Sequence, residues 1–146
     1  IKVINKGTKE EKIIKLLNDD NNISIKNNYS IRLIKDKVLE FKDKTCLVME
    51  RFNNDEIVLF EDFQKVCIQL SGFFSFLHHL KIAHCDIKPH NILFSNSNKE
   101  IRVIDFGLAE FFEDDELFDD YRGTEGFIPP EVEQKLEHRK DCGDIY

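Results

Sequence analysis

The chain has 146 residues, of which 41% are hydrophobic and 34% charged, and its formal net charge is −7. This composition is typical of a folded globular domain, and no apolar run reaches the length of a membrane span. The negative charge argues against a nucleic-acid-binding protein with a broadly basic surface and favours basic protein partners.

The N-terminal residues predict a strand followed by a short helix. Ile1 to Ile4 is an apolar stretch interrupted by Lys2, and the Asn-Lys-Gly-Thr sequence at 5–8 ends it as a turn. Thr8 is a suitable helix N-cap, and the apolar residues after it recur at helical spacing as far as Asn18. We therefore expect an amphipathic helix from Thr8 to Asn18. Taken by itself, Lys2 is expected at the surface.

The next part of the chain predicts a loop and two strands. Asp19 to Ser30 is polar and rich in asparagine, which is typical of a loop that tolerates insertion. Ile31 to Phe41 then alternates imperfectly between apolar and polar residues, and Cys46 to Met49 is a second apolar run, with residues 42–45 as the turn between them. This pattern predicts two antiparallel strands.

The longest predicted helix has apolar residues three and four positions apart over nearly three heptads: Phe60, Phe63, Cys67, Leu70, Phe74 and Leu77. A short coiled coil is one interpretation of this spacing. However, Gly72 and the further apolar residues Val66, Phe73 and Leu80 widen the stripe beyond a two-position seam. We therefore favour a buried helix of a larger domain.

The cysteines and histidines indicate no metal site of their own. The four cysteines lack a C-x-x-C pair and mostly lie in apolar surroundings, which argues against zinc and against a disulfide framework. We expect a reducing, intracellular compartment. His78 and His79, at the end of the long helix, are interpreted as solvated or capping residues and not as ligands.

The most informative stretch runs from His84 to Asn91 in the order His-Cys-Asp-Ile-Lys-Pro-His-Asn. Two short apolar runs follow at 92–94 and 101–104, separated by polar residues, and Asp105-Phe106-Gly107 comes directly after the second run. This pattern predicts a hairpin that carries charged groups at both ends.

Four polar side chains are expected to converge at the mouth of that hairpin: Asp86, Lys88, Asn91 and Asp105. Phosphoryl transfer requires a carboxylate to orient and deprotonate a hydroxyl, a cation for the transferring phosphoryl group, and oxygen ligands for Mg²⁺. The four side chains supply those groups. They therefore indicate a phosphoryl-transfer site.

The order and spacing resemble the protein kinase family, whose catalytic loop reads H-R-D-x-x-x-x-N and whose metal-binding turn reads D-F-G. Gly123-Thr124 and Pro129-Pro130-Glu131 follow where the family has G-T and A-P-E. The resemblance covers essentially the whole chain. It implies an α+β, two-lobed protein-kinase-like fold that is partial here, with the end of the small β-rich lobe and the first part of the helical lobe.

The resemblance also divides the chain into parts. Residues 1–49 would belong to the small lobe without its glycine-rich loop, and residues 50–53 would be the hinge. Residues 54–146 would belong to the large lobe and end after the activation segment. A complete kinase domain is larger, so we expect this chain to be a piece of one.

Within the catalytic stretch, the resemblance implies a role for each polar residue. Asp86 would accept the proton of the substrate hydroxyl, and Lys88 would neutralise charge on the γ-phosphoryl oxygens. Lysine at this position is, in the family, a mark of serine/threonine specificity. Asn91 and Asp105 would hold Mg²⁺, which takes oxygen ligands and keeps several waters.

On the nucleotide side, the resemblance implies that Lys2 grips the α- and β-phosphates of ATP and pairs with a glutamate of the first helix. Glu10 fits best as that partner, and Glu11 is the alternative. Met49 would guard the back of the nucleotide pocket. The backbone groups of the hinge would bind the adenine edge, and the hinge would consist of Glu50, Arg51 and Phe52.

Two other positions have structural roles by resemblance. His84 would pack against the Asp105-Phe106-Gly107 turn, and Asp144 would brace the catalytic loop from beneath. The family's usual Arg before the catalytic Asp is replaced by Cys85, so this position offers no cation to a phosphate on the activation loop.

The segment Glu110 to Asp120 contains seven acidic residues, and most of these charges are expected to be solvated. It lacks serine, which leaves Tyr121 and Thr124 as the nearby hydroxyls, and Thr124 would face the substrate. We hypothesise that activity does not depend on phosphorylation of this loop.

Three functional hypotheses follow. The first is an ATP- and Mg²⁺-dependent protein kinase acting on serine or threonine. The second is a pseudokinase or allosteric binding module with the same fold, against which the intact Lys2, Asp86, Asn91 and Asp105 argue. The third is a truncated, inactive fragment, because no glycine-rich loop precedes Lys2 and an apolar face of the long helix would stay exposed.

Overall fold

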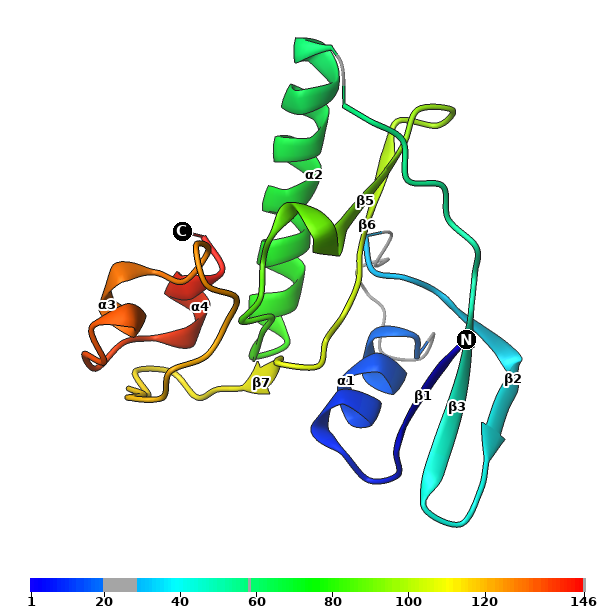
Figure 1. The fold of residues 1–146 in the computed structure, drawn as a ribbon, viewed down its shortest axis with the longest axis horizontal. Coiled ribbons are helices and arrows are strands. Elements are labelled where there is room, and N and C mark those ends of the chain that lie inside the picture. The colour runs from blue at the N-terminus through cyan, green and yellow to red at the C-terminus, as the bar shows by residue number, and fades with distance from the viewer. Residues whose placement is uncertain (20–28, 58, 146) are drawn as a thin grey trace.

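The computed structural model describes residues 1–19, 29–57 and 59–145. In Figure 1 the long helix α2 (Phe60–His79) stands between two groups of elements. The three N-terminal strands and the first helix lie on one side of it, and the two short C-terminal helices lie on the other. The elements are β1 (Lys2–Asn5), α1 (Lys9–Leu17), β2 (Leu33–Glu40), β3 (Lys44–Met49), α2 (Phe60–His79), β4 (Ile82–Ala83), β5 (Ile92–Ser95), β6 (Glu100–Val103), β7 (Glu110–Phe111), α3 (Pro130–Glu133) and α4 (Lys140–Gly143).

The N-terminal strands form an antiparallel three-stranded sheet in the order β1-β3-β2. The central strand β3 pairs Cys46 with Val3 on one side and with Leu39 on the other. The predicted strands and their antiparallel pairing are therefore confirmed, although β3 begins earlier than expected because Thr45 already pairs with Glu40. Most of the predicted loop from Asp19 to Ser30, namely residues 20–28, lies outside the described residues.

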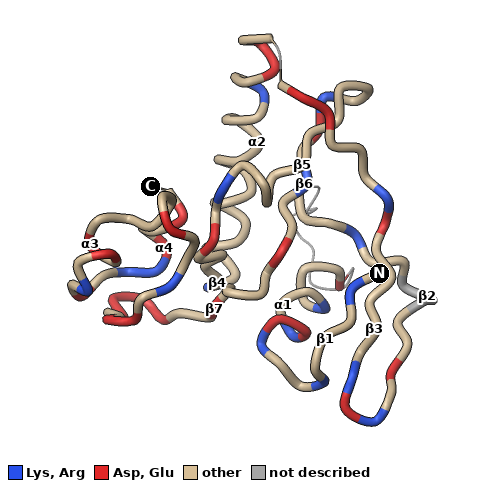
Figure 2. The backbone as a smooth tube through the Cα atoms, in the orientation of Figure 1, with Lys and Arg blue, Asp and Glu red and all other residues tan. Residues whose placement is uncertain are grey.

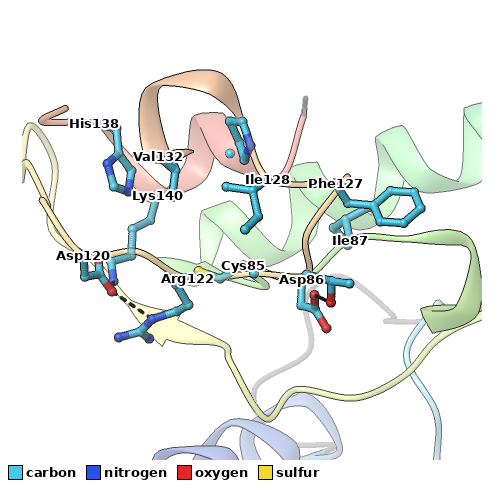
Figure 3. A pocket seen from close by; sticks show the side chains of 14 residues that line it. Cys85, Asp86, Ile87, Asp120, Arg122, Phe127, Ile128, Val132, His138 and Lys140 are labelled. Atoms are coloured by element: carbon cyan, nitrogen blue, oxygen red, sulfur yellow. Dashed lines mark hydrogen bonds and ion pairs between the residues drawn. The ribbon is translucent and has the colours of Figure 1, made fainter. Parts of the chain in front are cut away.

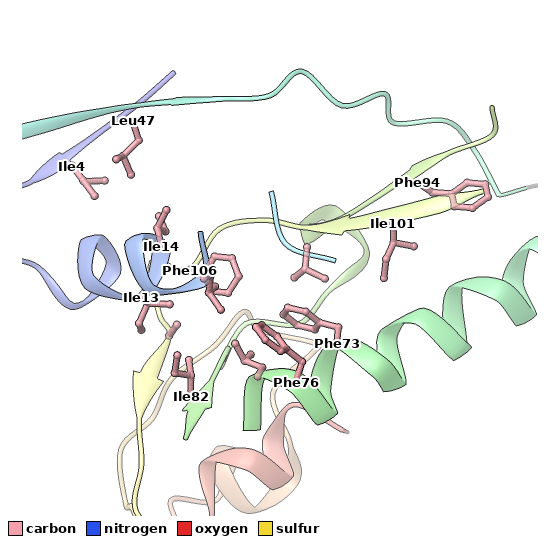
Figure 4. Close-up of a cluster of buried hydrophobic side chains, with 14 of the residues drawn as sticks. Ile4, Ile13, Ile14, Leu47, Phe73, Phe76, Ile82, Phe94, Ile101 and Phe106 are labelled. Atoms are coloured by element: carbon pink, nitrogen blue, oxygen red, sulfur yellow. The ribbon is translucent and has the colours of Figure 1, made fainter. Parts of the chain in front are cut away.

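Helix α1 begins where the sequence predicts, because the Thr8 side chain accepts a hydrogen bond of 3.3 Å from the backbone N–H of Glu11. Its apolar face, with Ile13, Ile14 and Leu17, is buried. This face packs toward the sheet residues Ile4 and Leu47, as Figure 4 shows. The predicted amphipathic helix is confirmed.

Helix α2 is the long helix that the spacing predicts, but the stripe of residues facing the core differs from the predicted one. Val66, Phe73, Phe76 and Leu77 are buried, whereas Phe60, Phe63 and Cys67 are exposed. The reason is the hairpin of β5 and β6, which contacts the face of the helix that carries Val66, Gln69 and Phe73. In that contact Gln69 donates to the Lys99 carbonyl and accepts from the Ile101 N–H.

The opposite face of α2 is open in the described part of the chain. Phe60 is 74% exposed and Ile68 is 72% exposed. This agrees with the expected exposed apolar face and argues against a coiled coil formed within the described residues. Cys67, on this face, and Cys142 are exposed, so the expectation of apolar surroundings is wrong for these two cysteines.

A glycine in α2 allows the chain to cross the helix closely. A Cβ atom at Gly72 would lie 3.1 Å from the Tyr29 hydroxyl oxygen. The segment that contains Tyr29 runs beside β6, where the Tyr29 carbonyl accepts from the Val103 N–H at 2.6 Å and Ile31 N–H donates to the Val103 carbonyl. The small residue in the helix therefore lets this segment reach the hairpin.

The predicted hairpin after the catalytic stretch is confirmed. Strands β5 and β6 pair antiparallel, with Ile92 opposite Val103 and Phe94 opposite Ile101. A second, two-residue ladder joins β4 to β7 and ties Ala83 to Glu110. The catalytic stretch therefore lies between two short ladders that hold both of its ends.

One hydrophobic core connects these elements. It extends from the sheet through α1 to α2 and the hairpin, with Phe106 and Ile82 near its middle (Figure 4). The α+β architecture, with a small β-rich part next to a helical part, agrees with the predicted fold class. Within the described ranges, no helix combines the length and the apolar character needed to cross a bilayer.

Candidate active site

Asp86 is held by three side chains around its carboxylate. Lys88 Nζ donates to Oδ2 at 2.8 Å, Asn91 Nδ2 donates to the same oxygen at 3.1 Å, and Thr124 Oγ1 donates to Oδ1 at 2.6 Å. Burial by itself would raise the pKa of Asp86, but these hydrogen bonds outweigh it and hold the pKa below its usual value. The side chain is therefore a fixed carboxylate at neutral pH.

The backbone around Asp86 adopts a sharp turn. Cys85 has a φ of 62°, in the left-handed region that non-glycine residues rarely adopt. Two hydrogen bonds fix this conformation, because the carboxylate of buried Asp144 accepts from the His84 N–H at 2.7 Å and from the Cys85 N–H at 2.8 Å. Pro89 then begins a 3-10 turn that ends at Asn91.

His84 lies fully buried against the Asp105-Phe106-Gly107 turn. Its ring centroid is 5.0 Å from that of Phe106, and its Nε2 atom is 3.1 Å from the Ile104 carbonyl oxygen. Burial lowers the pKa of His84, so the ring is neutral. The predicted packing of His84 is confirmed.

His78 differs from the prediction. Its Nε2 atom lies 3.0 Å from Asp144 Oδ2, and its ring stacks on Phe74. His78 is therefore part of the support beneath the catalytic stretch and is neither solvated nor a cap. His79 is exposed, as expected. The correction has a physical reason, since helix α2 turns His78 toward α4 and His79 away from it.

The Cys85 thiol carries no charge in this position. Burial, together with the nearby Asp144 carboxylate, raises the pKa of Cys85 to about 12. The residue therefore supplies neither a cation nor a thiolate, in line with the expectation drawn from its side chain.

Lys2 joins the small sheet to the second motif. Its Nζ atom forms ion pairs with Glu10 of α1 and, at 2.8 Å, with Oδ1 of Asp105. Burial would lower the pKa of Lys2, but the hydrogen bonds from its ammonium to Asp105 and Glu10 raise it overall. The same contact with Lys2 lowers the pKa of Asp105. The structure thus brings all three residues together.

Glu11 has a separate task. It is buried and accepts hydrogen bonds from the Gly7 N–H at 2.6 Å and from the Thr45 hydroxyl at 2.8 Å. Thr8 and Glu11 have the spacing of a capping box, a signal that the sequence contained and that separates Glu11 from Glu10. Glu11 anchors the start of α1 to the sheet and is not the partner of Lys2.

A cavity of about 340 Å³ lies between the sheet and the hairpin. This volume is in the range of small-molecule sites. Its lining combines the charged pair with apolar residues from both sides of the molecule: Ile1, Lys2, Ile14, Ile31, Met49, Glu50, Ile104, Asp105 and Phe106. Met49, predicted to guard the back of the nucleotide pocket, and Glu50 of the predicted hinge therefore line the same cavity as Lys2, whereas Arg51 and Phe52 are not part of its lining.

An arginine that was not predicted as a site residue, Arg102, holds Glu50 and Phe52 after Met49. Arg102 of β6 is buried, its Nε donates to Glu50 Oε1 at 3.0 Å, and its guanidinium carbon lies 4.7 Å from the Phe52 ring centroid. No local pattern predicts this contact, because Glu50 and Phe52 lie 52 and 50 positions before Arg102 in the chain. Glu50 and Phe52 thus use their side chains to join the sheet to the hairpin.

The donor set available for a divalent cation consists of oxygen atoms. Asn91 donates through Nδ2 to the Asp86 carbonyl at 2.9 Å and to its carboxylate, so the amide oxygen of Asn91 is the atom left to bind a cation. Asp105 supplies a carboxylate. Such hard oxygen donors fit Mg²⁺. In the described part of the chain, no three His, Cys, Asp or Glu side chains form a metal cluster by themselves, so phosphate oxygens would have to complete the shell.

Comparison with known proteins covers the whole chain. Residues 1–146 match the family model described as protein kinase domain. Similar proteins include the serine/threonine-protein kinase dkf-1 of Caenorhabditis elegans, 32% identical over 114 residues. Another is the probable serine/threonine-protein kinase fhkA of Dictyostelium discoideum, 34% identical over 142 residues. The matches cover 69% and 92% of this chain, but the chain spans only 16% and 23% of these relatives.

Proposed function

The chain belongs to the protein kinase domain family, and we propose that it forms part of an ATP- and Mg²⁺-dependent kinase that phosphorylates serine or threonine residues of proteins. The observation that carries this proposal is the fixed carboxylate of Asp86, held by Lys88, Asn91 and Thr124. A carboxylate in this arrangement is what an acceptor hydroxyl needs for orientation and proton removal.

In the proposed reaction the acceptor hydroxyl takes the place of the Thr124 hydroxyl at Asp86 Oδ1 or lies beside it. The acceptor oxygen forms a bond to the γ-phosphorus, the bond between that phosphorus and the β–γ bridging oxygen breaks, and ADP leaves. Asp86 takes the proton of the hydroxyl. Lys88, whose ammonium lies 2.8 Å from Asp86, would neutralise charge on the γ-phosphoryl oxygens.

The cavity beside Lys2 is the proposed ATP site. Its lining by Met49 and Glu50 on one side and by Asp105 on the other supports this assignment, with residues 50–53 as the hinge. Lys2 would bind the α- and β-phosphates while Glu10 keeps its ammonium in place. Asn91 and Asp105 would hold Mg²⁺, which supplies electrostatic stabilisation of the phosphates.

Serine/threonine specificity is the finer part of the proposal. It is supported by Lys88, two residues after Asp86, and by relatives whose names describe serine/threonine-protein kinases. We propose an intracellular location, because the four cysteines are free in the structure and such thiols persist in reducing compartments.

The test is transfer of labelled γ-phosphate from Mg·ATP to a basic protein substrate by the full-length protein, beside its Asp86→Asn variant. We expect transfer to serine and threonine that the substitution lowers by about 10²- to 10⁴-fold. If neither protein transfers phosphate while ATP still raises the melting temperature, the chain is a nucleotide-binding pseudokinase and the proposal is wrong.

A further inference from the structure

Five charged side chains of alternating sign form a continuous chain through the segment that follows the Asp105-Phe106-Gly107 turn. Lys9 of α1 pairs with Glu110, whose Oε2 atom also pairs with Arg122 at 3.1 Å. Arg122 in turn pairs with Asp120 Oδ2 at 2.8 Å. The same oxygen lies 3.1 Å from Lys140 Nζ at the start of α4. We call these five residues the charge chain.

The inner members of the charge chain are not ordinary surface pairs. Glu110 and Lys140 are buried, and the Lys140 ammonium lies 4.1 Å from the Phe118 ring centroid. A buried ammonium is costly without a counter-charge, and Asp120 supplies it. By contrast, the outer Lys9 side chain is mostly exposed, and we expect its contribution to be small.

The charge chain borders the catalytic stretch. Cys85, Asp120, Arg122 and Lys140 line one cavity, and Figure 3 shows the Asp120–Arg122 pair beside Cys85 and Asp86. The neutral Cys85 side chain brings no cation to this place. The two cations at this place are instead Arg122 and Lys140, and the Asp120 carboxylate already binds both.

Arg122 is also close to the catalytic residues along the backbone. It precedes Gly123, whose φ of 125° strains any other residue, and a Cβ atom there would lie 3.1 Å from the Ile128 side chain. Thr124 follows and donates to Asp86. Fixing the Arg122 side chain therefore restricts the short path that places Thr124 against Asp86.

We infer that Asp120 is a positioning residue that holds the segment from Glu110 to Thr124 in its catalytic arrangement without any phosphate, by binding Arg122 and Lys140 at once. This inference rests on the proposed kinase function. It differs from the solvated acidic loop expected for this segment. Figure 2 shows acidic residues crowding the loop between β7 and α3, and of these Asp120 pairs with Arg122 and Lys140. Glu110, in β7 itself, pairs with Arg122.

The experiment compares Asp120→Asn with Asp119→Asn in the full-length protein. The control makes the same change of charge one residue away, at an exposed aspartate. We expect Asp120→Asn to lower kcat about tenfold or more, equivalent to about 1.4 kcal/mol, with the KM for ATP unchanged. Asp119→Asn should stay within about twofold, as an exposed charge does. Phosphatase treatment of the wild-type protein should leave kcat unchanged.

A double variant separates positioning from charge neutralisation. Asp120→Asn leaves Lys140 buried and unpaired, which by itself lowers stability. The variant with both Asp120→Asn and Lys140→Met removes that penalty but still deprives Arg122 of its pair with Asp120, while the pair of Arg122 with Glu110 remains. If Asp120 positions the segment through Arg122, the double variant folds and kcat stays low. Recovery of kcat in the double variant would show a merely structural role and overturn the inference.

A readout without catalysis distinguishes failure of this inference from failure of the proposed function. Hydrogen exchange of the backbone amides at 118–124 should be faster in Asp120→Asn than in Asp119→Asn, whether or not the protein transfers phosphate. Equal exchange in the two variants, or a wild-type kcat that falls after phosphatase treatment, would contradict the inference.

Discussion

The Oδ2 atom of Asp144 accepts a hydrogen bond of 2.7 Å from the backbone N–H of His84, a residue 60 positions earlier in the chain. Its Oδ1 atom accepts from the next N–H, that of Cys85. One buried carboxylate therefore satisfies two successive backbone donors and holds the left-handed conformation of Cys85 directly before the proposed catalytic base.

Asp144→Ala should lower the free energy of unfolding by about 2–5 kcal/mol, because the buried His84 N–H and the part-buried Cys85 N–H lose their acceptor. It should also lower phosphate transfer, since the turn before Asp86 is no longer fixed. Urea denaturation measures the first effect. The control is Asp141→Ala, which breaks a surface pair with Arg139 and should cost less than about 1 kcal/mol. Equal losses in the two variants would show that the His84 and Cys85 contacts are unimportant.

Lys2→Met should lower kcat/KM for ATP about a hundredfold, as the loss of one fixed charge at a phosphate does. The ammonium of Lys2 lies between Glu10 and Asp105, and a methionine fills a similar volume without charge. Steady-state kinetics at varied ATP measures the effect. Lys6→Met, which removes a lysine paired with Glu40 on the surface of the sheet, should change the rate by less than about twofold. A similar loss in both variants would point to a general effect of charge.

Glu50→Gln should weaken ATP binding severalfold and lower the free energy of unfolding by about 1–2 kcal/mol, because the buried Arg102 guanidinium loses its ion pair with Glu50, although the pair with Glu100 remains. Calorimetric titration with ATP and urea denaturation measure the two effects. Glu56→Gln is the matched control, since Glu56 is exposed. Unchanged ATP affinity in Glu50→Gln would mean that Arg102 does not hold the proposed hinge.

Glu11 should make the stability depend on pH at acidic values. Hydrogen bonds from Lys15 outweigh burial and, with those from Gly7 and Thr45, lower the pKa of Glu11 from 4.5 to about 2. Because the folded pKa is depressed, its contribution is fully present above about pH 4.5 and is lost as the pH falls toward 2.

Denaturation of wild-type protein and Glu11→Gln across this range tests the effect. The wild type should be more stable near neutral pH by about 1–3 kcal/mol, and the difference should shrink as the pH falls from 4.5 to 2. Glu137→Gln, at an exposed position, should show no such dependence. A difference between wild type and Glu11→Gln that is constant with pH would refute the assignment.

Local patterns predicted most of the fold. Strands β1 to β3, helix α1 and the β5–β6 hairpin follow directly from alternation, helical spacing and turn residues. Each of these patterns lies within one continuous stretch of sequence. The two-residue ladder between Ile82 and Phe111 could not be predicted in this way. It depends on where the catalytic stretch returns to the end of α2.

The motif fixes residue type and spacing for Asp86, Lys88 and Asn91, which lie in contact as expected. The catalytic and metal-binding roles of these residues and of Asp105 stay predictions. Supporting contacts were harder to predict. The face of α2 that is buried depends on the hairpin packed against it, and the Arg102–Glu50 pair joins residues 52 positions apart. The choice between Glu10 and Glu11 was accessible, since the capping-box spacing from Thr8 assigns Glu11 to the helix start.

The contact between Gly72 and Tyr29 has a consequence for ligand recognition. Tyr29 rests on the bare backbone of the long helix, and Ile31, two residues later, lines the proposed ATP site. A methyl group added at Gly72 would lie 3.1 Å from the Tyr29 hydroxyl oxygen, so the Tyr29 side chain would have to shift. The absent side chain at Gly72 thus leaves room for the segment that brings Ile31 to the proposed ATP site, although the long helix does not itself line that cavity.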